Sequence, residues 1–308
     1  MKIISQHNVN LYRNIAQNQV KYSNQCSKSN DMVSFCANLN GSNRTKKAKD
    51  VGYKIYELTK RKNEGLEQIC TFCKKDIPIL EMDYIENLPR RLLDSKIRYN
   101  AYTLPSYGDD CSLDKVTMYI PKGKLTPSKI SSIVHEYVHC EQAYQDESYM
   151  GLFDITGGDL AQTRALNSMS NAIFNNMQAK KTKPLLLKAH LGMLTKKDDI
   201  LAMRNAMGCK NDDDLKHFFL DEALKLIDST IVAIINEPDV DEFMPLAKNP
   251  KKLRKIILEQ CKIKAMQEKE AYLAQKEFLQ DINAHLSIEN RTNPIFYETL
   301  VNALSSIE

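Results

Sequence analysis

The pattern of hydrophobic and polar positions divides the chain into a polar start and a long remainder with helical periodicity. Ser, Asn, Lys and Asp dominate from residue 23 to residue 50, where apolar residues form only short islands. A segment with so few apolar side chains cannot bury enough surface to offset the entropy of ordering. We therefore expect residues 1–50 to form a mobile leader, with room for one short docked segment, and residues 51–308 to form the folded domain.

Segments of distinct character are expected between residues 51 and 125. A helix that ends near Lys62 and a second helix over Asp76–Leu93 are predicted, because apolar residues recur in both at three- and four-residue spacing. Turn-forming residues dominate 100–113, which we interpret as a loop. Apolar and polar residues then alternate over 115–120, and this period of two predicts a short strand.

The region after Gly158 is expected to be helical for most of its length. Breaks are expected at three places: near Pro184, at 208–213 and at 237–250. A last long helix spans roughly Leu253–Leu286, and a short terminal helix follows Pro294. Many helices with few strands predict an α+β fold that is predominantly helical, with a small sheet near residues 100–121.

The helix that follows the predicted strand has a clear start in the sequence. Thr126 is a preferred N-cap residue, Pro127 suits the first helical position, and the helix should extend to about Glu147. This helix contains the motif HExxH, whose fixed residues are His135, Glu136 and His139.

The spacing of the motif suits a metal ion. His135 and His139 are four residues apart, so on a helix they lie on one face, one turn apart, and can share one ion. Glu136 lies near the same face, where it can act on a water at the metal without binding the metal itself. Two imidazoles with a carboxylate favour zinc (Zn2+). In the ordinary alternative, both histidines are surface or core residues of an amphipathic helix.

With this motif and the strand before it, the chain resembles the zincin metallopeptidases, and among them the gluzincins. The resemblance covers the strand at 115–120, the helix at 127–147 and one later helix. It implies a zincin-like fold and a zinc-dependent metallopeptidase that hydrolyses peptide bonds through a metal-activated water. It also implies that the strand at 115–120 forms the edge of the active-site cleft and pairs with an extended substrate. Extended to Gln142, the motif looks like the HExxHxxQ variant of several zincin subgroups, whereas the metzincin extension is absent.

Gluzincins take a third zinc ligand from a later helix, often in the pattern ExxA, which Glu268 and Ala271 match. The phase of the last long helix supports Glu268 independently, because this residue interrupts an apolar stripe made of Leu258, Cys261, Ala265, Tyr272, Gln275, Leu279, Ile282 and Leu286. A buried carboxylate is costly unless it is paired or bound to metal, so Glu268 is the expected ligand. Alternatively, Glu268 forms a salt bridge at the edge of the stripe. Glu270 is the second candidate, and the remaining ones are Glu222, Asp159 and Glu147.

The resemblance assigns Glu136 as the base that takes a proton from the water and delivers it to the leaving amine. A donor to the oxyanion is also expected, from Tyr272, Tyr144 or Tyr149. Because the sequence between His139 and Glu268 is long for a gluzincin, residues from about 160 to 250 are expected to be a helical insertion that walls or covers the cleft.

The cysteines and the other histidines carry weaker signals. Cys70 and Cys73 form a CxxC pair, which is either half of a structural metal site completed by Cys111 or Cys140, or a redox pair. Because no second pair accompanies it, two packed thiols are the favoured interpretation. Cys140 is expected in the core. Three isolated histidines are expected to be structural: His190, His217 and His285.

Composition narrows the function classes further. Charged residues make up 27% and hydrophobic residues 43%, which is an ordinary globular mixture. The net charge of +4, with both signs interspersed, gives no argument for nucleic-acid binding. No apolar run has the length of a membrane span, and the first residues lack the pattern of a signal peptide. We expect a cytoplasmic protein, or one exported without a cleaved signal peptide.

Two other function classes stand beside the peptidase. The first is a catalytically inactive interaction protein on a zincin scaffold, and the second is a metal-dependent hydrolase of a non-peptide amide. The expected partner of the peptidase is a protein or peptide substrate. The oligomeric state is left open by the sequence.

Overall fold

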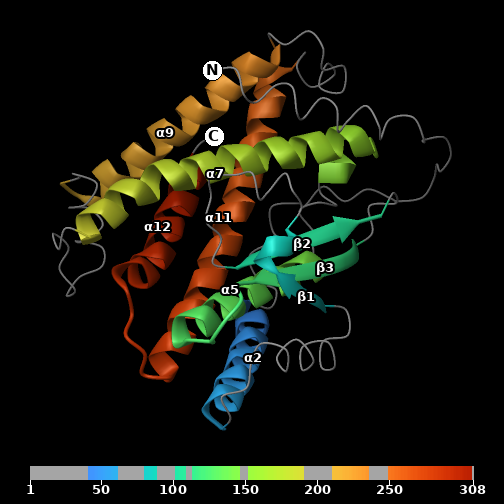
Figure 1. Cartoon of the computed structure of the whole chain (residues 1–308). Helices are drawn as coiled ribbons and strands as arrows, with labels where there is room; N and C mark the ends of the chain where they lie inside the picture. Colours follow the sequence, from blue (N-terminus) through green and yellow to red (C-terminus); the bar gives the residue numbers. More distant parts are fainter. Residues whose placement is uncertain are drawn as a thin grey trace.

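The computed structural model describes residues 41–61, 80–88, 101–108, 113–145, 152–190, 210–235 and 249–306. Within these residues the fold is α+β and mostly helical, with one small sheet (Figure 1). Helix α11 (Pro250–Asp281) passes through the middle of the molecule, and the other helices pack around it. The predicted fold class is thereby confirmed in its coarse form.

The sheet has the strand order β1-β3-β2, with β3 (Leu113–Ile120) in the centre. Strand β1 (Leu80–Tyr84) pairs with β3 in parallel, and β2 (Tyr102–Tyr107) pairs with it antiparallel. The predicted strand at 115–120 is thus confirmed. Every residue from 116 to 120 is buried, and because neighbouring side chains point to opposite faces, the end of β3 is covered on both sides.

Two predictions in this region are wrong. Where it is described, the helix expected over Asp76–Leu93 is strand β1 followed by the short 3-10 helix η2 (Ile85–Asn87). The loop expected over 100–113 contains strand β2. Both strands are stabilised by pairing with β3, and such long-range pairing overrides local propensity. Pro105 is tolerated because β2 lies at an edge of the described sheet, where its missing N–H need not break the ladder.

Helix α5 (Pro127–Tyr144) begins as predicted. Thr126 has an extended backbone, and its side chain accepts a hydrogen bond from the main-chain N–H of Lys129. The helix ends at Tyr144, slightly before the predicted end near Glu147, which lies outside the described residues.

One hydrophobic core lies between the sheet, α5, α2 (Gly41–Arg61) and the C-terminal half of α11. Each element contributes large side chains that are almost fully buried, among them Ile55, Met118, Ile133 and Phe278. This core fixes α5 between the sheet on one side and α11 with α2 on the other. The histidine motif is therefore carried by a rigid element.

Gly52 marks the closest approach of α2 to its neighbours. A Cβ atom at this position would lie 2.4 Å from Cγ2 of Val134 and 2.9 Å from Cε2 of Phe278. Both neighbours are fully buried and have no free space to move into. Any side chain at residue 52 would therefore push α2 away from α5 and α11.

We expect Gly52→Ala to lower the free energy of unfolding by about 1–2 kcal/mol. Overpacking costs about 1–3 kcal/mol, of which the better helix propensity of alanine returns at most about 1 kcal/mol. Urea denaturation measures the change. Lys46→Ala on the exposed side of the same helix is the control and should change stability little. Equal stability of the two variants would contradict the close approach.

Helix α2 begins earlier than expected. Residues 41–50, assigned to the leader, are helical, and Ala48 is fully buried against the domain. Two lysines of this segment form salt bridges with α5 and α11: Lys47 with Glu141 at 2.9 Å and Lys49 with Glu277 at 2.8 Å. The boundary expected at residue 50 therefore falls inside a docked helix, and residues 1–40 lie outside the description.

A second core unites α7 (Leu160–His190), α9 (Asp212–Ile235), α12 (Ile288–Ser305) and the N-terminal half of α11. The expected helical insertion at about 160–250 corresponds to α7 and α9, which share this core with the later helices. In Figure 1, α7 crosses α11 above the sheet. These helices therefore belong to the body of the fold.

Two prolines were misinterpreted. Helix α7 continues through Pro184, where a break was expected, and Pro294 lies inside α12 and not before it. Proline inside a helix costs a hydrogen bond, which tertiary packing can offset. The long helix α11 spans Pro250–Asp281, close to the predicted Leu253–Leu286.

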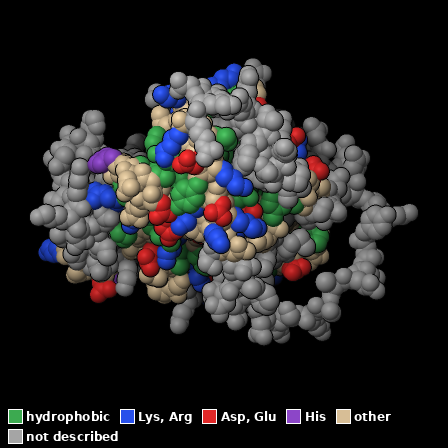
Figure 2. Space-filling model, turned by 90° about the horizontal axis from the view of Figure 1, so that it is seen from below, with side chains coloured by type: hydrophobic (Ala, Val, Ile, Leu, Met, Phe, Trp, Pro, Cys, Tyr) green, Lys and Arg blue, Asp and Glu red, His purple; other side chains and the backbone are tan. Residues whose placement is uncertain are grey.

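The surface seen from the end where α2 lies carries acidic and basic side chains intermixed around small apolar areas (Figure 2). This matches the interspersed charges of the sequence. Among the helices in the described ranges, none has both the length and the hydrophobicity needed to cross a membrane.

Candidate metal centre

Helices α5 and α11 run antiparallel, and their polar faces meet along a seam. Near the start of α5, Ser131 Oγ accepts a hydrogen bond from Nε2 of Gln275 at 3.1 Å. Near its end, Nε2 of Gln142 donates to the main-chain carbonyl of Gln267 at 3.1 Å. Positions 131, 135, 139 and 142 share one face of α5 because they are spaced by three or four residues. This face presents two histidines to α11.

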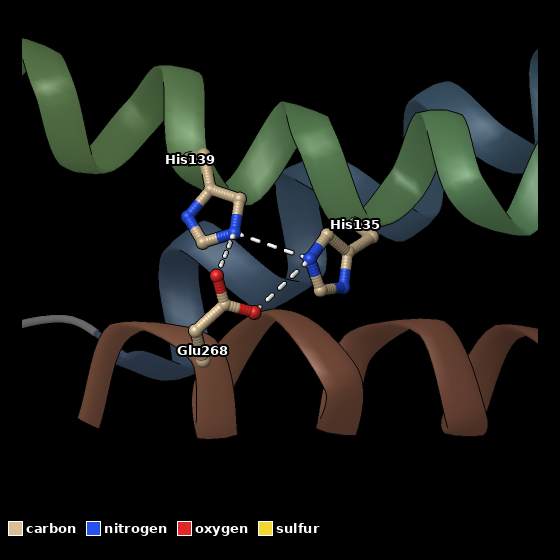
Figure 3. Close-up of side chains that lie close together, drawn as sticks. All are labelled: His135, His139 and Glu268. Carbon is tan, nitrogen blue, oxygen red and sulfur yellow. Dashed lines mark hydrogen bonds and ion pairs between the residues drawn. The ribbon is translucent and has the colours of Figure 1, made fainter. Parts of the chain in front are cut away.

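Three side chains converge in the middle of the seam. His135 and His139 point from α5 toward α11, and Glu268 points back toward both (Figure 3). The two Nε2 atoms of the histidines are 3.1 Å apart. Oε2 of Glu268 lies 3.5 Å from Nε2 of His135, and Oε1 lies 3.6 Å from Nε2 of His139. The structure thus brings together the three residues that were predicted to bind the metal.

The spacing of these atoms suits zinc. Bonds of about 2.0–2.2 Å at tetrahedral angles separate the donor atoms by about 3.3–3.6 Å. The two Nε2 atoms are 3.1 Å apart, and they lie 3.5 and 3.6 Å from different oxygens of Glu268. With one ligand atom from each residue, the three atoms lie within 4.8 Å of one another, which is close to the spacing that zinc requires. The side chain of His135 is 10% exposed, whereas those of His139 and Glu268 are 21% and 24% exposed. The group is therefore open on one side, as a site with a fourth position for water or substrate requires.

Electrostatics favour a positive charge between the three side chains. Burial by itself would lower the pKa of His135, but hydrogen bonding to Glu268 and the charges of Glu268 and Glu136 raise it. Burial would likewise raise the pKa of Glu268, but the charge of His139, a hydrogen bond to His135 and its charge lower it. A divalent cation meets the same need for positive charge beside Glu268 as a proton on the imidazoles.

The two histidines are held in different ways. Nδ1 of His139 lies 2.8 Å from Oε1 of Gln142, so a proton on Nδ1 leaves Nε2 free to bind a metal. Nδ1 of His135 is buried, and no atom of the described residues lies in hydrogen-bond geometry with it. The ring of His135 packs against Tyr272, with centroids 4.3 Å apart, and Tyr272 stacks on Tyr297 of α12 at 5.4 Å. The contact with Gln142 therefore orients His139, whereas Glu268 and the ring of Tyr272 position His135.

Glu136 lies beside the group without belonging to it. It is half-buried, and its charge contributes to the raised pKa of His135. Its carboxylate does not belong to the group of His135, His139 and Glu268 that could hold a metal ion. Its main-chain carbonyl accepts a hydrogen bond from Oγ1 of Thr103 at 3.0 Å, which ties α5 to strand β2. Glu136 is thus close enough for its charge to act on the potential ligand His135.

The other carboxylates proposed as third ligand have other partners or lie outside the description. Glu270 pairs with Arg44 of α2, whose Nε lies 3.0 Å from Oε1. Asp159 is exposed and accepts a hydrogen bond from the N–H of Gln162 at the start of α7. The side chains of two candidates are not described: Glu147 and Glu222.

The expectation that residues 115–120 offer a free edge to substrate is wrong. Strand β3 is central and pairs with β1 on one side and β2 on the other, so its main-chain groups are already used. No strand in the described residues pairs with the outer side of β2. Because Thr103 of β2 also contacts Glu136, β2 is the edge strand nearest the site.

The tyrosines, cysteines and histidines named in the sequence analysis differ in whether they lie at the site. Tyr272 lies at the site, whereas Tyr144 lies near Cys140 and Glu141, and burial raises its pKa to about 12. Cys140 is buried, as predicted. Two histidines expected to be structural are exposed: His217 and His285. The description does not include Tyr149, Cys70, Cys73, Cys111 or the side chain of His190.

Two residues near the site had no role in the sequence-based prediction. Lys264 lies one turn before Glu268, and its positive charge lowers the pKa of the Glu268 carboxyl. Nζ of Lys264 donates a hydrogen bond to Oδ1 of Asn167 in α7 at 3.3 Å. The four-residue spacing from Glu268 was an available signal for Lys264. Arg44 had no such signal, because its contact with Glu270 joins distant parts of the sequence.

The site therefore contains three potential zinc ligands, a neighbouring carboxylate and an edge strand. Any function has to be inferred from this geometry, since the likeness to gluzincins rests on short motifs. Comparison of the chain with protein-family models, with curated proteins and with solved structures found no match.

Proposed function

We propose that the chain is a zinc-dependent metallopeptidase with a zincin-like arrangement of strand and helices. The observation that carries the proposal is the group of His135, His139 and Glu268, whose potential ligand atoms lie within 4.8 Å of one another, and two imidazoles with a carboxylate are a ligand set that zinc prefers. The position of Glu136 supports it, because this carboxylate lies near the group and is not one of the three donors.

A zinc ion held by these three residues would supply a Lewis acid that lowers the pKa of a water to about 7 and polarises a carbonyl. In the proposed reaction the carboxylate of Glu136 takes a proton from the attacking water and returns it to the leaving nitrogen. Tyr272 is the proposed donor to the carbonyl oxygen, since its ring contacts His135. Packing against Tyr297 keeps that ring in place.

We propose that the substrate is an extended peptide that pairs with the outer edge of β2. The support is the position of β2 at an edge of the described sheet and its contact with α5 at Glu136. Added strands are recognised through main-chain hydrogen bonds, which a peptide offers and a small non-peptide amide does not. The edge strand therefore favours a peptidase over a hydrolase of another amide.

Zinc analysis tests the metal centre. The protein should bind one zinc ion per chain, and His135→Ala should lose it, because the two remaining donors bind zinc far more weakly. His285→Ala is the matched control, since this histidine is exposed and outside the group. Elemental analysis after dialysis against a weak chelator measures the ratio. Wild-type protein that takes up no zinc would remove the basis of the proposal.

Cleavage of a peptide library separates the peptidase from the other functions. The zinc-loaded protein should generate new amino termini, counted by mass spectrometry, and a strong chelator should abolish them. Zinc binding without cleavage would favour a catalytically inactive interaction protein. Hydrolysis of small chromogenic amides without peptide cleavage would instead favour a hydrolase of non-peptide amides.

A further inference from the structure

Arg44 of α2 is joined to a zinc ligand through two intermediate side chains. Its guanidinium binds Glu270 through two atoms, with Nε 3.0 Å from Oε1 and Nη2 3.0 Å from Oε2. Oε2 of Glu270 accepts a hydrogen bond from Nε2 of Gln142 at 2.9 Å, and Oε1 of Gln142 lies 2.8 Å from Nδ1 of His139. One continuous series of contacts therefore runs from α2 through α11 to the metal ligand on α5.

The partners of Gln142 allow one orientation of its amide. Nε2 faces two atoms that only accept hydrogen bonds, the carbonyl oxygen of Gln267 at 3.1 Å and the carboxylate of Glu270. A flipped amide would set its own oxygen against both, which is repulsive. Oε1 must therefore face His139, and it accepts a hydrogen bond from the N–H at Nδ1. With Nδ1 protonated, Nε2 of neutral His139 carries the lone pair that a metal needs.

Arg44 keeps Glu270 in this position. The two side chains are only 20% and 16% exposed, so the carboxylate would be poorly solvated without its partner. The bidentate contact also fixes the plane of the carboxylate, because guanidinium and carboxylate match in geometry. Nη1 of Arg44 donates to Oε1 of Gln145 at 2.6 Å, which anchors the guanidinium at the end of α5.

We propose that Arg44 is a positioning residue of the metal centre, which fixes the tautomer and orientation of His139 through Glu270 and Gln142. The inference rests on the proposed zinc site and deepens it. It makes α2 a part of the site, although no residue of α2 belongs to the three-ligand group. Loss of Arg44 frees Glu270 to turn toward solvent, and Gln142 then keeps only one of the two acceptors that exclude the flipped amide, the carbonyl of Gln267.

A matched pair of variants separates this role from simple docking of α2. Lys47 lies one turn after Arg44 and forms a salt bridge with Glu141 of α5 at 2.9 Å, outside the series of contacts to His139. Arg44→Met and Lys47→Met each remove one cation that docks α2. We expect zinc affinity, measured by competition with a chelating dye, to fall at least about tenfold in the first and to stay unchanged in the second. Equal affinity in wild type and both variants would overturn the proposal.

The tautomer of His139 can be read in the zinc-free protein by long-range proton–nitrogen NMR with labelled histidine. Wild type and Lys47→Met should show one form, protonated on Nδ1, and Arg44→Met should show a mixture. A single unchanged form in Arg44→Met would overturn the proposal. This measurement needs no metal, so it gives an answer even when zinc analysis contradicts the proposed function.

Exchanging the side chains of residues 142 and 270 tests the same series of contacts while Arg44 stays in place. Gln142→Glu places two carboxylates together, and Glu270→Gln replaces one of the two acceptors that fix the amide by a group that can also donate, so each should weaken zinc binding about tenfold or more. The double variant restores one carboxylate, one amide donor and an acceptor for Nδ1 of His139. Because the carbonyl of Gln267 loses its donor whenever residue 142 is Glu, we expect the double variant to recover part of the affinity lost in the single variants. Losses that simply add in the double variant would contradict a connected series.

Discussion

Glu136→Gln should abolish peptide hydrolysis while zinc stays bound. The amide has the shape of the carboxylate but cannot take a proton from water or return one to the leaving nitrogen. General acid–base catalysis contributes about 10²–10⁴-fold, so kcat/KM for a cleaved peptide should fall by about that factor. The zinc content should not change, because the three donor atoms belong to His135, His139 and Glu268.

The matched control is Glu141→Gln on the same helix. Glu141 pairs with Lys47 and accepts a hydrogen bond from the hydroxyl of Tyr137, away from the three ligands. This variant should keep both zinc and activity. Full activity in Glu136→Gln would assign proton transfer to another group, and loss of zinc in that variant would show that Glu136 is a ligand and not a base.

The parts of the site that local sequence determines were predictable. Thr126 and Pro127 fix the start of α5, and the four-residue spacing of the histidines fixes their common face. Glu268 was identified because a carboxylate interrupts an apolar stripe, and in the structure it does meet both histidines. The role of these residues as zinc ligands stays a prediction that metal analysis has to test.

The parts that depend on long-range contacts were not predictable. Strand β1 was expected to be helical, because its pairing with β3 cannot be read from either segment alone. The edge position of β3 was expected from the resemblance to zincins, and the turn-forming residues at 100–113 did not indicate strand β2. Arg44 stood in a polar stretch that suggested a leader, and its partner Glu270 lies far along the chain. Neither residue carries a local signal for that contact.

Zinc should stabilise the folded protein strongly at neutral pH. A ligand that binds only the native state adds about 4 kcal/mol when its free concentration exceeds Kd a thousandfold. Glu268→Ala removes one of three donors, and a loss of affinity of at least about a hundredfold would reduce this to about 1.4 kcal/mol or less. Thermal or urea unfolding with and without zinc measures the difference. Glu259→Ala, an exposed change on the same helix, should keep the full effect.

The stability of the zinc-free protein should also depend on pH, because His135 and Glu268 both have shifted pKa values in the folded state. The pKa of His135 is raised above 6.5, so its contribution is complete below 6.5 and is lost as pH rises through the folded-state pKa. The pKa of Glu268 is lowered below 4.5, so its contribution is complete above 4.5 and is lost as pH falls through the folded-state pKa. The pair therefore stabilises the zinc-free protein most between these two pH values.

In the proposed site, zinc and protons compete for the same atoms. The stabilisation by zinc should therefore be large at pH values where the stabilisation by protonated His135 is small. Zinc binds neutral imidazole, and at a pH below the raised pKa of His135 it must first displace a proton. The gain in stability from zinc should thus be largest above pH 7 and fall steadily toward pH 5. In Glu268→Ala both the zinc gain and the pH dependence of the zinc-free protein should shrink together. A zinc gain that does not depend on pH would show that the metal binds elsewhere than between these side chains.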